Sequence, residues 1–351
     1  MNPFSEAKIN SLSIKNRFVR SATWEGCANE DGSVTDELIS LYRILSKAEI
    51  GLIITGHAYV SREGKATPRQ LGIYKDELIS GLKKLTDEVH KEGGKIFIQL
   101  SHAGRFSRKE LIGSDPININ RLKKEEIERL IQVFCDSSER AKKAGFDGIQ
   151  LHAAHGYLLN QFFSPFFNER DDEYGGSVRN RARFAERIVK GIRDRLGSDY
   201  PLILKMNCQD FKEGGLSLND SIEIAKILED SGIDGIEISG GLLISKKYGP
   251  CRTYKGPYFL KEALLFRENL NIPIFLVGGI RSFKDSEEII RKGIDFVSMS
   301  RPFICEPDIV KRWKSGDLRD SLCFSDNLCF VAVKEKTPVR CIRKDEDKPN
   351  I

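Results

Sequence analysis

Residues 144–162 read AGFDGIQLHAAHGYLLNQF and join the end of one predicted helix, a strand and the start of the next helix. The run at 147–152 has strand length and gives way to a polar loop that carries two histidines. Similar phrases, SGIDG at 231–235 and KGIDF at 292–296, also connect a helical pattern to an apolar run through a glycine suited to the C′ position. The three stretches therefore indicate the αβ turns of one recurring architecture.

Apolar runs of strand length recur along the whole chain, with helical patterns between them at 76–92, 124–144, 178–196 and 218–231. The eight runs are 17–23, 50–55, 95–100, 147–152, 202–207, 234–239, 273–278 and 294–300. Eight βα units predict an α/β fold, a single (β/α)8 TIM barrel. We expect one domain over 1–351, with the barrel at about 14–315 and a C-terminal extension at 316–351.

Composition excludes several functional classes. The chain has 56 Lys and Arg against 51 Asp and Glu, and no basic run with interleaved aromatic residues, so nothing indicates nucleic-acid binding. No signal peptide and no apolar run of transmembrane length is found, which predicts a cytoplasmic protein without a membrane partner. Most of the eight cysteines are isolated in apolar segments, as expected for reduced thiols.

Four of the five histidines fall where an apolar run ends: His57, His102, His152 and His155. The remaining one, His90, lies in a stretch with helical spacing. Barrel enzymes build their active sites from the loops that follow the strands. The histidine distribution therefore predicts an enzyme with its site on that face.

His152 and His155 are three residues apart, so they share one face if a helix begins within their loop. Two imidazoles directed at a carbonyl or phenolate oxygen would stabilise negative charge there, and the nearby Tyr157 could deliver a proton to the adjacent carbon. This arrangement predicts reduction of an activated alkene. A zinc pair, which needs a further ligand, and histidines that only cap the helix are the alternatives.

Glycines and polar or charged residues stand in or just after several predicted strands. VGGI at 277–280 offers the backbone N–H groups of Gly278 and Gly279, and Ser300 with Arg301 follows the next strand, which together predict a phosphate site. Lys205 lies inside a strand run, so it should face the barrel mouth and meet an anion. Gln99 suits the polar edge of a heterocycle, although either residue could be a satisfied polar group at the rim.

Two connections are longer than ordinary βα loops. Residues 103–123 predict a functional excursion over the mouth, and 240–258, where Gly240, Gly241 and Gly249 allow movement, predict a mobile lid. The tail KDEDKPNI is expected to be frayed.

With these residues assembled, the sequence resembles the Old Yellow Enzyme family of flavin-dependent ene-reductases over nearly its whole length. The central block is the most specific: His-x-x-His-Gly-Tyr-Leu is followed by N-x-R-x-D-x-Y-G-G-S and N-R-x-R-F within 144–184. The other motifs are IKNRFVRSAT (14–23), GLIITG (51–56), KIFIQLSHAGR (95–105) and SMSRPF (298–303).

The resemblance implies a barrel that binds FMN, takes electrons from NADH or NADPH and reduces the C=C bond of α,β-unsaturated carbonyl compounds. It implies that His152 and His155 bind the substrate oxygen and that Tyr157 is the proton donor. It also implies a small-molecule enone-like substrate and a homodimer or homotetramer. The implied cofactor-binding residues are Ala22, Thr23, Trp24, Gly56, His57, Gln99, Lys205, Gly278, Gly279, Ser300 and Arg301.

The sequence departs from the family pattern at three places. Lys205 stands where arginine is usual, which keeps the positive charge but loses the two-pronged geometry. Trp24, just after Thr23, stands where cysteine or threonine often touches flavin O4. Longer relatives hold an iron–sulfur cluster on four cysteines, whereas here Asp326 replaces one of them beside Cys323, Cys329 and Cys341. A degenerate remnant without metal is therefore expected.

Two further alternatives stay open on the residues alone. One keeps the barrel and the phosphate site but acts as an aldolase or isomerase on a phosphorylated substrate, with Lys205 as a Schiff-base lysine. The other is a non-catalytic barrel that binds flavin as a sensor or scaffold.

Overall fold

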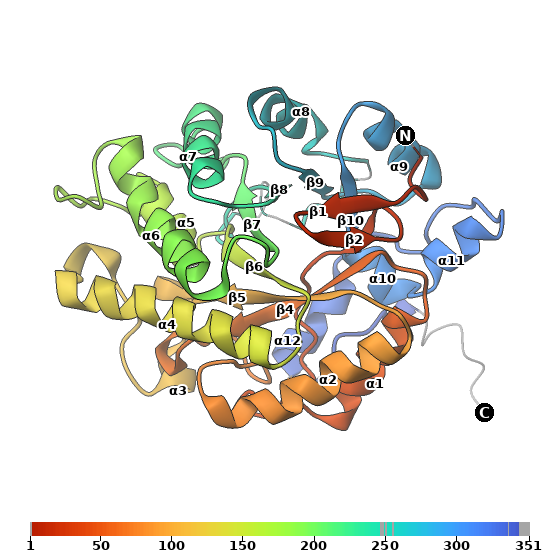
Figure 1. The fold of residues 1–351 in the computed structure, drawn as a ribbon, viewed down its shortest axis with the longest axis horizontal. Coiled ribbons are helices and arrows are strands. Elements are labelled where there is room, and N and C mark those ends of the chain that lie inside the picture. Colours follow the sequence, from red (N-terminus) through yellow and green to blue (C-terminus); the bar gives the residue numbers. More distant parts are fainter. Residues whose placement is uncertain (1, 246–248, 250, 255, 336, 344–351) are drawn as a thin grey trace.

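The computed structural model describes residues 2–245, 249, 251–254, 256–335 and 337–343. Its centre is a closed barrel of parallel strands in the order β10-β3-β4-β5-β6-β7-β8-β9 (Figure 1). The strands are β3 Phe18–Arg20, β4 Leu52–Tyr59, β5 Ile96–Ser101, β6 Gly148–Ala153, β7 Leu202–Asn207, β8 Ile236–Ser239, β9 Ile274–Val277 and β10 Phe296–Met299. Each lies in or overlaps one of the predicted apolar runs, so the (β/α)8 barrel is confirmed.

Helices surround the barrel and cover its outer face (Figure 1). They are α1 Asp36–Ser46, α2 Ile79–Lys91, α3 Lys109–Ile112, α4 Lys124–Lys143, α5 Leu158–Phe163, α6 Val178–Leu196, α7 Leu218–Asp230, α8 Leu260–Asn269, α9 Phe283–Arg291, α10 Arg301–Cys305, α11 Ile309–Lys314 and α12 Val331–Glu335. The helical patterns read from the sequence correspond to α2, α4, α6 and α7. The turns before β6, β8 and β10 carry left-handed φ at Gly145, Gly232 and Gly293, as their phrases predict.

Local sequence explains where several helices begin. Thr35, Ser177, Ser217 and Ser282 each occupy an N-cap position, and each side-chain oxygen accepts a hydrogen bond from the backbone N–H three residues on. Such caps satisfy one of the backbone donors left over at a helix start. The chain therefore leaves the site-forming loops and enters α1, α6, α7 and α9 at defined residues.

A short antiparallel hairpin, β1 Ala7–Ile9 with β2 Leu12–Ile14, was not predicted from the sequence. Its buried side chains Ile9 and Ile14 pack on barrel residues near the strand starts, among them Leu52, Phe97 and Phe296. This packing closes the N-terminal end of the barrel with apolar side chains. The polar interior is consequently confined to the C-terminal ends of the strands.

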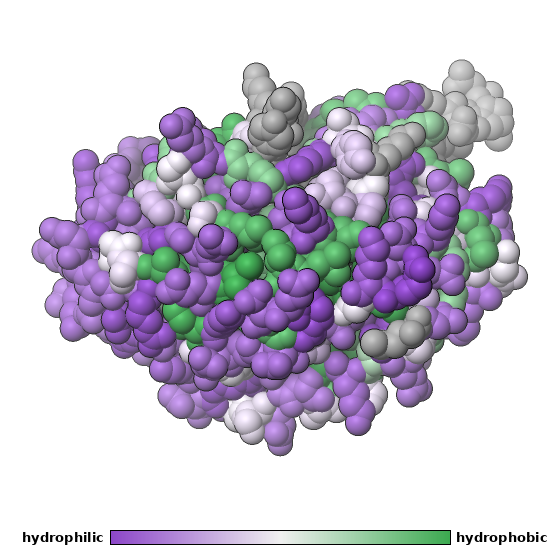
Figure 2. Space-filling view, turned by 90° about the horizontal axis from the view of Figure 1, so that it is seen from above, coloured by the Kyte–Doolittle hydropathy of each residue, from purple (hydrophilic) through white to green (hydrophobic). Residues whose placement is uncertain are grey.

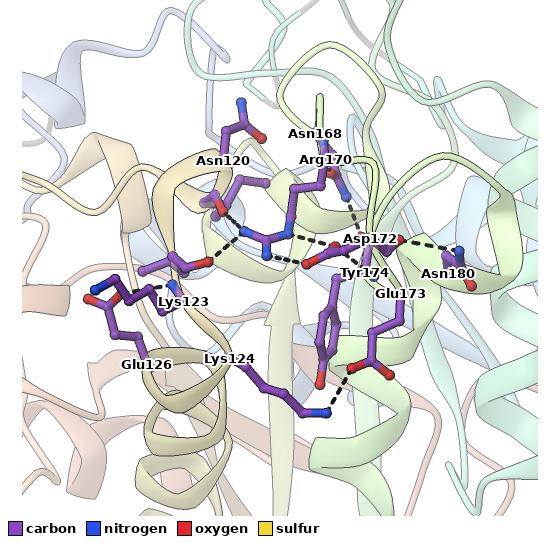
Figure 3. Close-up of polar contacts among 12 residues, drawn as sticks. Asn120, Lys123, Lys124, Glu126, Asn168, Arg170, Asp172, Glu173, Tyr174 and Asn180 are labelled. Atoms are coloured by element: carbon purple, nitrogen blue, oxygen red, sulfur yellow. Dashed lines mark hydrogen bonds and ion pairs between the residues drawn. The ribbon is translucent and has the colours of Figure 1, made fainter.

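The loop at 103–123 folds into short turns and is fastened from the segment after α5 (Figure 3). The Arg170 guanidinium donates to the backbone carbonyls of Ile119 and Leu122 and is paired with Asp172. The Asp172 carboxylate in turn accepts the backbone N–H of Tyr174 at 3.0 Å. Part of the N-x-R-x-D-x-Y motif is therefore a structural brace rather than a set of cavity residues.

Hydrophilic side chains cover most of the face shown in Figure 2, with hydrophobic side chains gathered in its middle. No helix among the described residues is both long and apolar enough to span a membrane. The predicted lid at 240–258 includes residues 246–248, 250 and 255, which lie outside the described part of the chain, as does the tail at 344–351.

Candidate active site

A cavity of about 270 Å³ opens at the C-terminal ends of the barrel strands. Its lining includes every site residue predicted from the sequence except Gly56. Gly56 is buried behind the wall, where its N–H donates to the Glu25 carboxylate at 2.7 Å. The predicted residues that line the cavity are Ala22, Thr23, Trp24, His57, Gln99, His152, His155, Tyr157, Lys205, Gly278, Gly279, Ser300 and Arg301.

His152 and His155 meet on one wall, but not through a shared helix face. His152 belongs to strand β6, and α5 begins only at Leu158. His155 instead adopts a left-handed backbone conformation with φ 64°, which is uncommon for a residue with a side chain. This turn brings the two rings to 5.3 Å between centroids. The helix-based expectation was therefore wrong in its reason, although the two side chains do converge.

Burial sets the protonation state of this wall. It lowers the pKa of His57 to about 4, with a further contribution from the positive charge of Lys205. Burial also holds the pKa values of His152 and His155 well below their usual range. All three imidazoles are consequently neutral at physiological pH, and each can donate only one N–H.

Tyr157 completes the histidine wall. Its ring lies 4.7 Å from that of His152 and 5.6 Å from that of His57, measured between centroids. Burial raises the pKa of Tyr157 to about 12, against a smaller lowering by Arg108. The hydroxyl therefore stays protonated at neutral pH and can act as a proton donor.

His152 and His155 differ in whether the protein supplies hydrogen-bond partners to their ring nitrogens. His155 Nε2 lies 2.8 Å from Ser239 Oγ, a contact that fixes its ring orientation. His152 Nδ1 is buried and has no hydrogen-bond partner among the described residues. An unsatisfied buried polar group costs about 1–3 kcal/mol. A ligand that meets this wall would offset part of that cost.

Below the histidine wall, polar side chains are linked across the barrel. Gln99 Nε2 donates to Gln150 Oε1 at 2.6 Å, and Gln150 Nε2 donates to Glu237 at 3.0 Å. Lys205 Nζ lies 3.2 Å from Glu237 Oε2 and donates to Ser21 Oγ at 2.9 Å. Gln99 and Lys205 are among the site residues predicted from the sequence, whereas Gln150 and Glu237, which lie within ordinary strand runs, are not.

The other end of the cavity is built by β9 and β10. Gly278 and Gly279 have φ values of 120° and 77°, and a Cβ on Gly279 would lie 1.7 Å from the Gly256 carbonyl oxygen. No other residue fits this position without moving the neighbouring loop. The backbone here can therefore approach a ligand closely.

Two arginines converge on this end. Arg301 is buried, and its guanidinium donates to the carbonyl of Ser325 and to Asn327 Oδ1. Arg281 also lines the cavity but was missed, although it follows VGGI directly. Its Nη2 donates to the Ser321 carbonyl at 3.2 Å, whereas Nε and Nη1 are buried without a partner among the described residues. The C-terminal extension thus positions both guanidinium groups.

Thr23 and Trp24 face different partners. The Thr23 hydroxyl bonds to the Ser21 carbonyl at 2.9 Å and to Ser300 Oγ at 2.7 Å. Trp24 Nε1 is buried and unpartnered within the described structure. Of these two side chains, it is therefore the indole N–H that is left as a hydrogen-bond donor for a ligand.

The C-terminal cysteines gather beside Asp326. Cys323, Cys329 and Asp326 line a small cavity with Cys341. Asp326 is engaged by Arg343 at 2.9 Å. No group of three or more His, Cys, Asp or Glu side chains in the described part of the chain has the geometry of a metal site.

Comparisons with known proteins identify the family. The sequence model of the NADH:flavin oxidoreductase / NADH oxidase family matches residues 3–319. The chain belongs to this family. It is 38% identical over 315 residues to an NADPH dehydrogenase of Geobacillus sp. (strain WCH70), covering 87% of this chain and 91% of that protein.

Other relatives are longer. An NADH oxidase of Thermoanaerobacter brockii is 37% identical over 366 residues, which cover 97% of this chain and 55% of that protein. The structure of 2-naphthoyl-CoA reductase with 2-naphthoyl-CoA has a TM-score of 0.91 at 28% identity, over 97% of this chain and 56% of that one. The chain therefore spans about half the length of these two relatives. An old yellow enzyme homologue from Zymomonas mobilis superposes over both full chains with a TM-score of 0.80 at 25% identity.

Family membership confirms the predicted resemblance, the enzyme class and the cofactor: an NAD(P)H-dependent flavin oxidoreductase that uses FMN. The residues present fit FMN. The unpartnered donors Trp24 Nε1 and Arg281 Nε and Nη1 suit a ligand with many acceptor oxygens. The glycine backbone and the two guanidinium groups at β9 and β10 suit a phosphate.

Proposed function

We propose that this chain reduces the carbon–carbon double bond of α,β-unsaturated carbonyl compounds, with NADH or NADPH as the source of electrons. The observation that carries the proposal is the convergence of neutral His152 and His155 with the protonated Tyr157 on one wall of the cavity. FMN, when bound, supplies the hydride for the β-carbon of the substrate. The small-molecule enone-like substrate would lie against this wall.

The three side chains divide the remaining work. The histidine N–H groups donate hydrogen bonds to the carbonyl oxygen of the substrate and stabilise the negative charge that grows there. Because burial keeps both rings neutral, they stabilise this charge as hydrogen-bond donors and do not protonate the oxygen. The Tyr157 hydroxyl gives its proton to the α-carbon, which completes addition of hydride and proton across the double bond.

The same proposal assigns the cofactor-binding residues. Lys205 and Gln99 would meet polar edges of the flavin ring, and Ser300, Arg301 and the neighbouring glycines would hold its phosphate, joined by Arg281. Residues 1–351 would act as one FMN-binding unit. A homodimer or homotetramer and a cytoplasmic location stay predictions.

The phosphorylated-substrate alternative is less well supported. A Schiff-base lysine needs a neutral amine as the nucleophile. Lys205 Nζ is instead paired with the buried Glu237 carboxylate and donates to Ser21 Oγ, so two protein groups already engage it. The family match also names flavin chemistry rather than aldol chemistry.

The test is an anaerobic absorption spectrum of the FMN-loaded protein, taken first with NADH or NADPH and then with 2-cyclohexenone. We expect the flavin absorbance to bleach with nicotinamide and to return with the enone. Replacing both His152 and His155 by alanine should slow the second phase and leave the first intact. His90→Ala, on the exposed face of α2, is the matched control. Return of the flavin absorbance at the unaltered rate in the double variant would contradict the assignment.

A further inference from the structure

Lys205 and Glu237 form a buried ion pair under the cavity. They are register partners on the neighbouring strands β7 and β8. Their charged groups are 3.2 Å apart, and the side chains are only 6% and 0% exposed. The chain therefore carries a carboxylate beside its predicted flavin-binding cation, at a depth where water cannot screen either charge.

The contacts around the pair fix both partners. Lys205 Nζ donates a hydrogen bond to Ser21 Oγ and is ion-paired with Glu237, while Lys205 also lines the cavity. Glu237 Oε2 also accepts from Gln150, whereas Oε1 is buried without a partner among the described residues. The carboxylate thus restrains the ammonium group and does not itself line the cavity.

The Lys205–Glu237 pair determines the electrostatic field on its side of the cavity. Burial keeps His57, His152 and His155 neutral, so none of them adds a charge to that of Lys205 on this side. The two arginines lie at the β9 and β10 end, where they are bonded to the C-terminal extension. The net field from the strand β7 and β8 side of the site therefore depends on how far Glu237 offsets Lys205.

We propose that Glu237 is a positioning residue that lowers the reduction potential of bound FMN by offsetting the charge of Lys205 and holding its ammonium group in place. This inference rests on the proposed location of the flavin edge beside Lys205. Two-electron reduction adds negative charge to the flavin ring, so an uncompensated cation would favour the reduced form. The buried carboxylate limits that preference and keeps the reduced cofactor a stronger hydride donor.

The test is the midpoint potential of the FMN holoenzyme, measured by anaerobic spectrophotometric titration against reference dyes. Glu237→Gln keeps the shape and removes the charge. We expect the reduction equilibrium to shift about tenfold toward reduced flavin, which is about +30 mV for a two-electron couple. Glu237→Asp, which withdraws the charge from Lys205, should give a value between wild type and Glu237→Gln. Glu288→Gln is the control and should leave the potential unchanged, because this half-exposed carboxylate on α9 is paired with Lys292 at the end of that helix.

The outcomes separate this inference from the function on which it rests. Lys205→Met should lower the potential, and an unchanged potential in that variant would show that the flavin edge is not beside Lys205. If Lys205→Met lowers the potential but Glu237→Gln leaves it unchanged or lowers it, the role of Glu237 is overturned. Should Glu237→Gln fail to retain FMN, a potential in Glu237→Asp at or below the wild-type value would overturn it equally.

Discussion

At the β9 and β10 end of the cavity, Arg281 and Arg301 carry permanent positive charge, whereas at the β4 and β6 wall burial keeps the three histidines neutral. Arg301 and His152 are both buried, so the difference between them comes from the intrinsic pKa of each side chain. Arginine keeps its proton under any environment a protein provides, and histidine gives it up when desolvated. One end is therefore suited to hold a fixed anion, and the other to stabilise charge that appears only during reaction.

The largest effect is expected when the positive charges at the β9 and β10 end are removed. Replacing Arg281 and Arg301 together by alanine should weaken FMN binding by about 10³-fold, because charge-assisted hydrogen bonds contribute about 1.5–3 kcal/mol each. Titration of the apoprotein with FMN, followed by flavin fluorescence, measures this. Arg179→Ala, an exposed arginine paired with Glu186 on α6, is the control. A double variant that binds FMN within threefold of wild type would place the phosphate elsewhere.

The neutral wall should respond in rate rather than in cofactor binding. Tyr157→Phe removes the proton donor, and general acid catalysis is worth about 10²-fold or more. Stopped-flow measurement should show slow reoxidation by the enone with unchanged reduction by NADH or NADPH. Tyr200→Phe, whose hydroxyl donates to Phe146 at the opposite end of the barrel, is the matched control. Equal loss in both half-reactions would mean that the variant perturbs the flavin instead.

Only part of this site and of the fold around it can be predicted from the sequence. The barrel strands are buried apolar runs, which single-sequence patterns detect, and the histidines and late glycines stand at their ends. The hairpin at Ala7–Ile14 escaped detection because its strands have three residues each. The left-handed turn at His155 carries no glycine to mark it.

The polar residues Gln150 and Glu237 could not be predicted for a different reason. Gln150 and Glu237 become partners only through the register and closure of the barrel, which a strand pattern does not specify. Arg281 was detectable, since it directly follows a glycine turn predicted to bind phosphate. Local patterns therefore located the two ends of the site, and long-range geometry determined what links them.

Lowering the pH should reduce the free energy of unfolding through the histidine wall and not through the arginines at the other end. In the unfolded chain a histidine binds a proton below about pH 6.5, whereas in the folded protein burial lowers the pKa of His57 to about 4. Between these values the unfolded state binds more protons, so the free energy of unfolding rises with pH, by at most about 1.4 kcal/mol per pH unit for each such histidine. Thermal melts between pH 4 and 7 measure this. His57→Asn should reduce the slope, and an unchanged slope would mean that His57 is protonated in the fold.

The smallest expected effect concerns the orientation of a neutral donor. Ser239→Ala removes the hydroxyl that lies 2.8 Å from His155 Nε2, so the ring loses the contact that fixes it. A neutral hydrogen bond contributes about 0.5–1.5 kcal/mol, which corresponds to a rise in KM for the enone of roughly twofold to thirteenfold. FMN affinity should stay constant, because Ser239 lies on the histidine side of the cavity. Ser315→Ala, at the end of α11, is the control. An effect on FMN binding equal to that on KM would mean that the two ends of the cavity are coupled. The charged end and the neutral end would then not have independent functions.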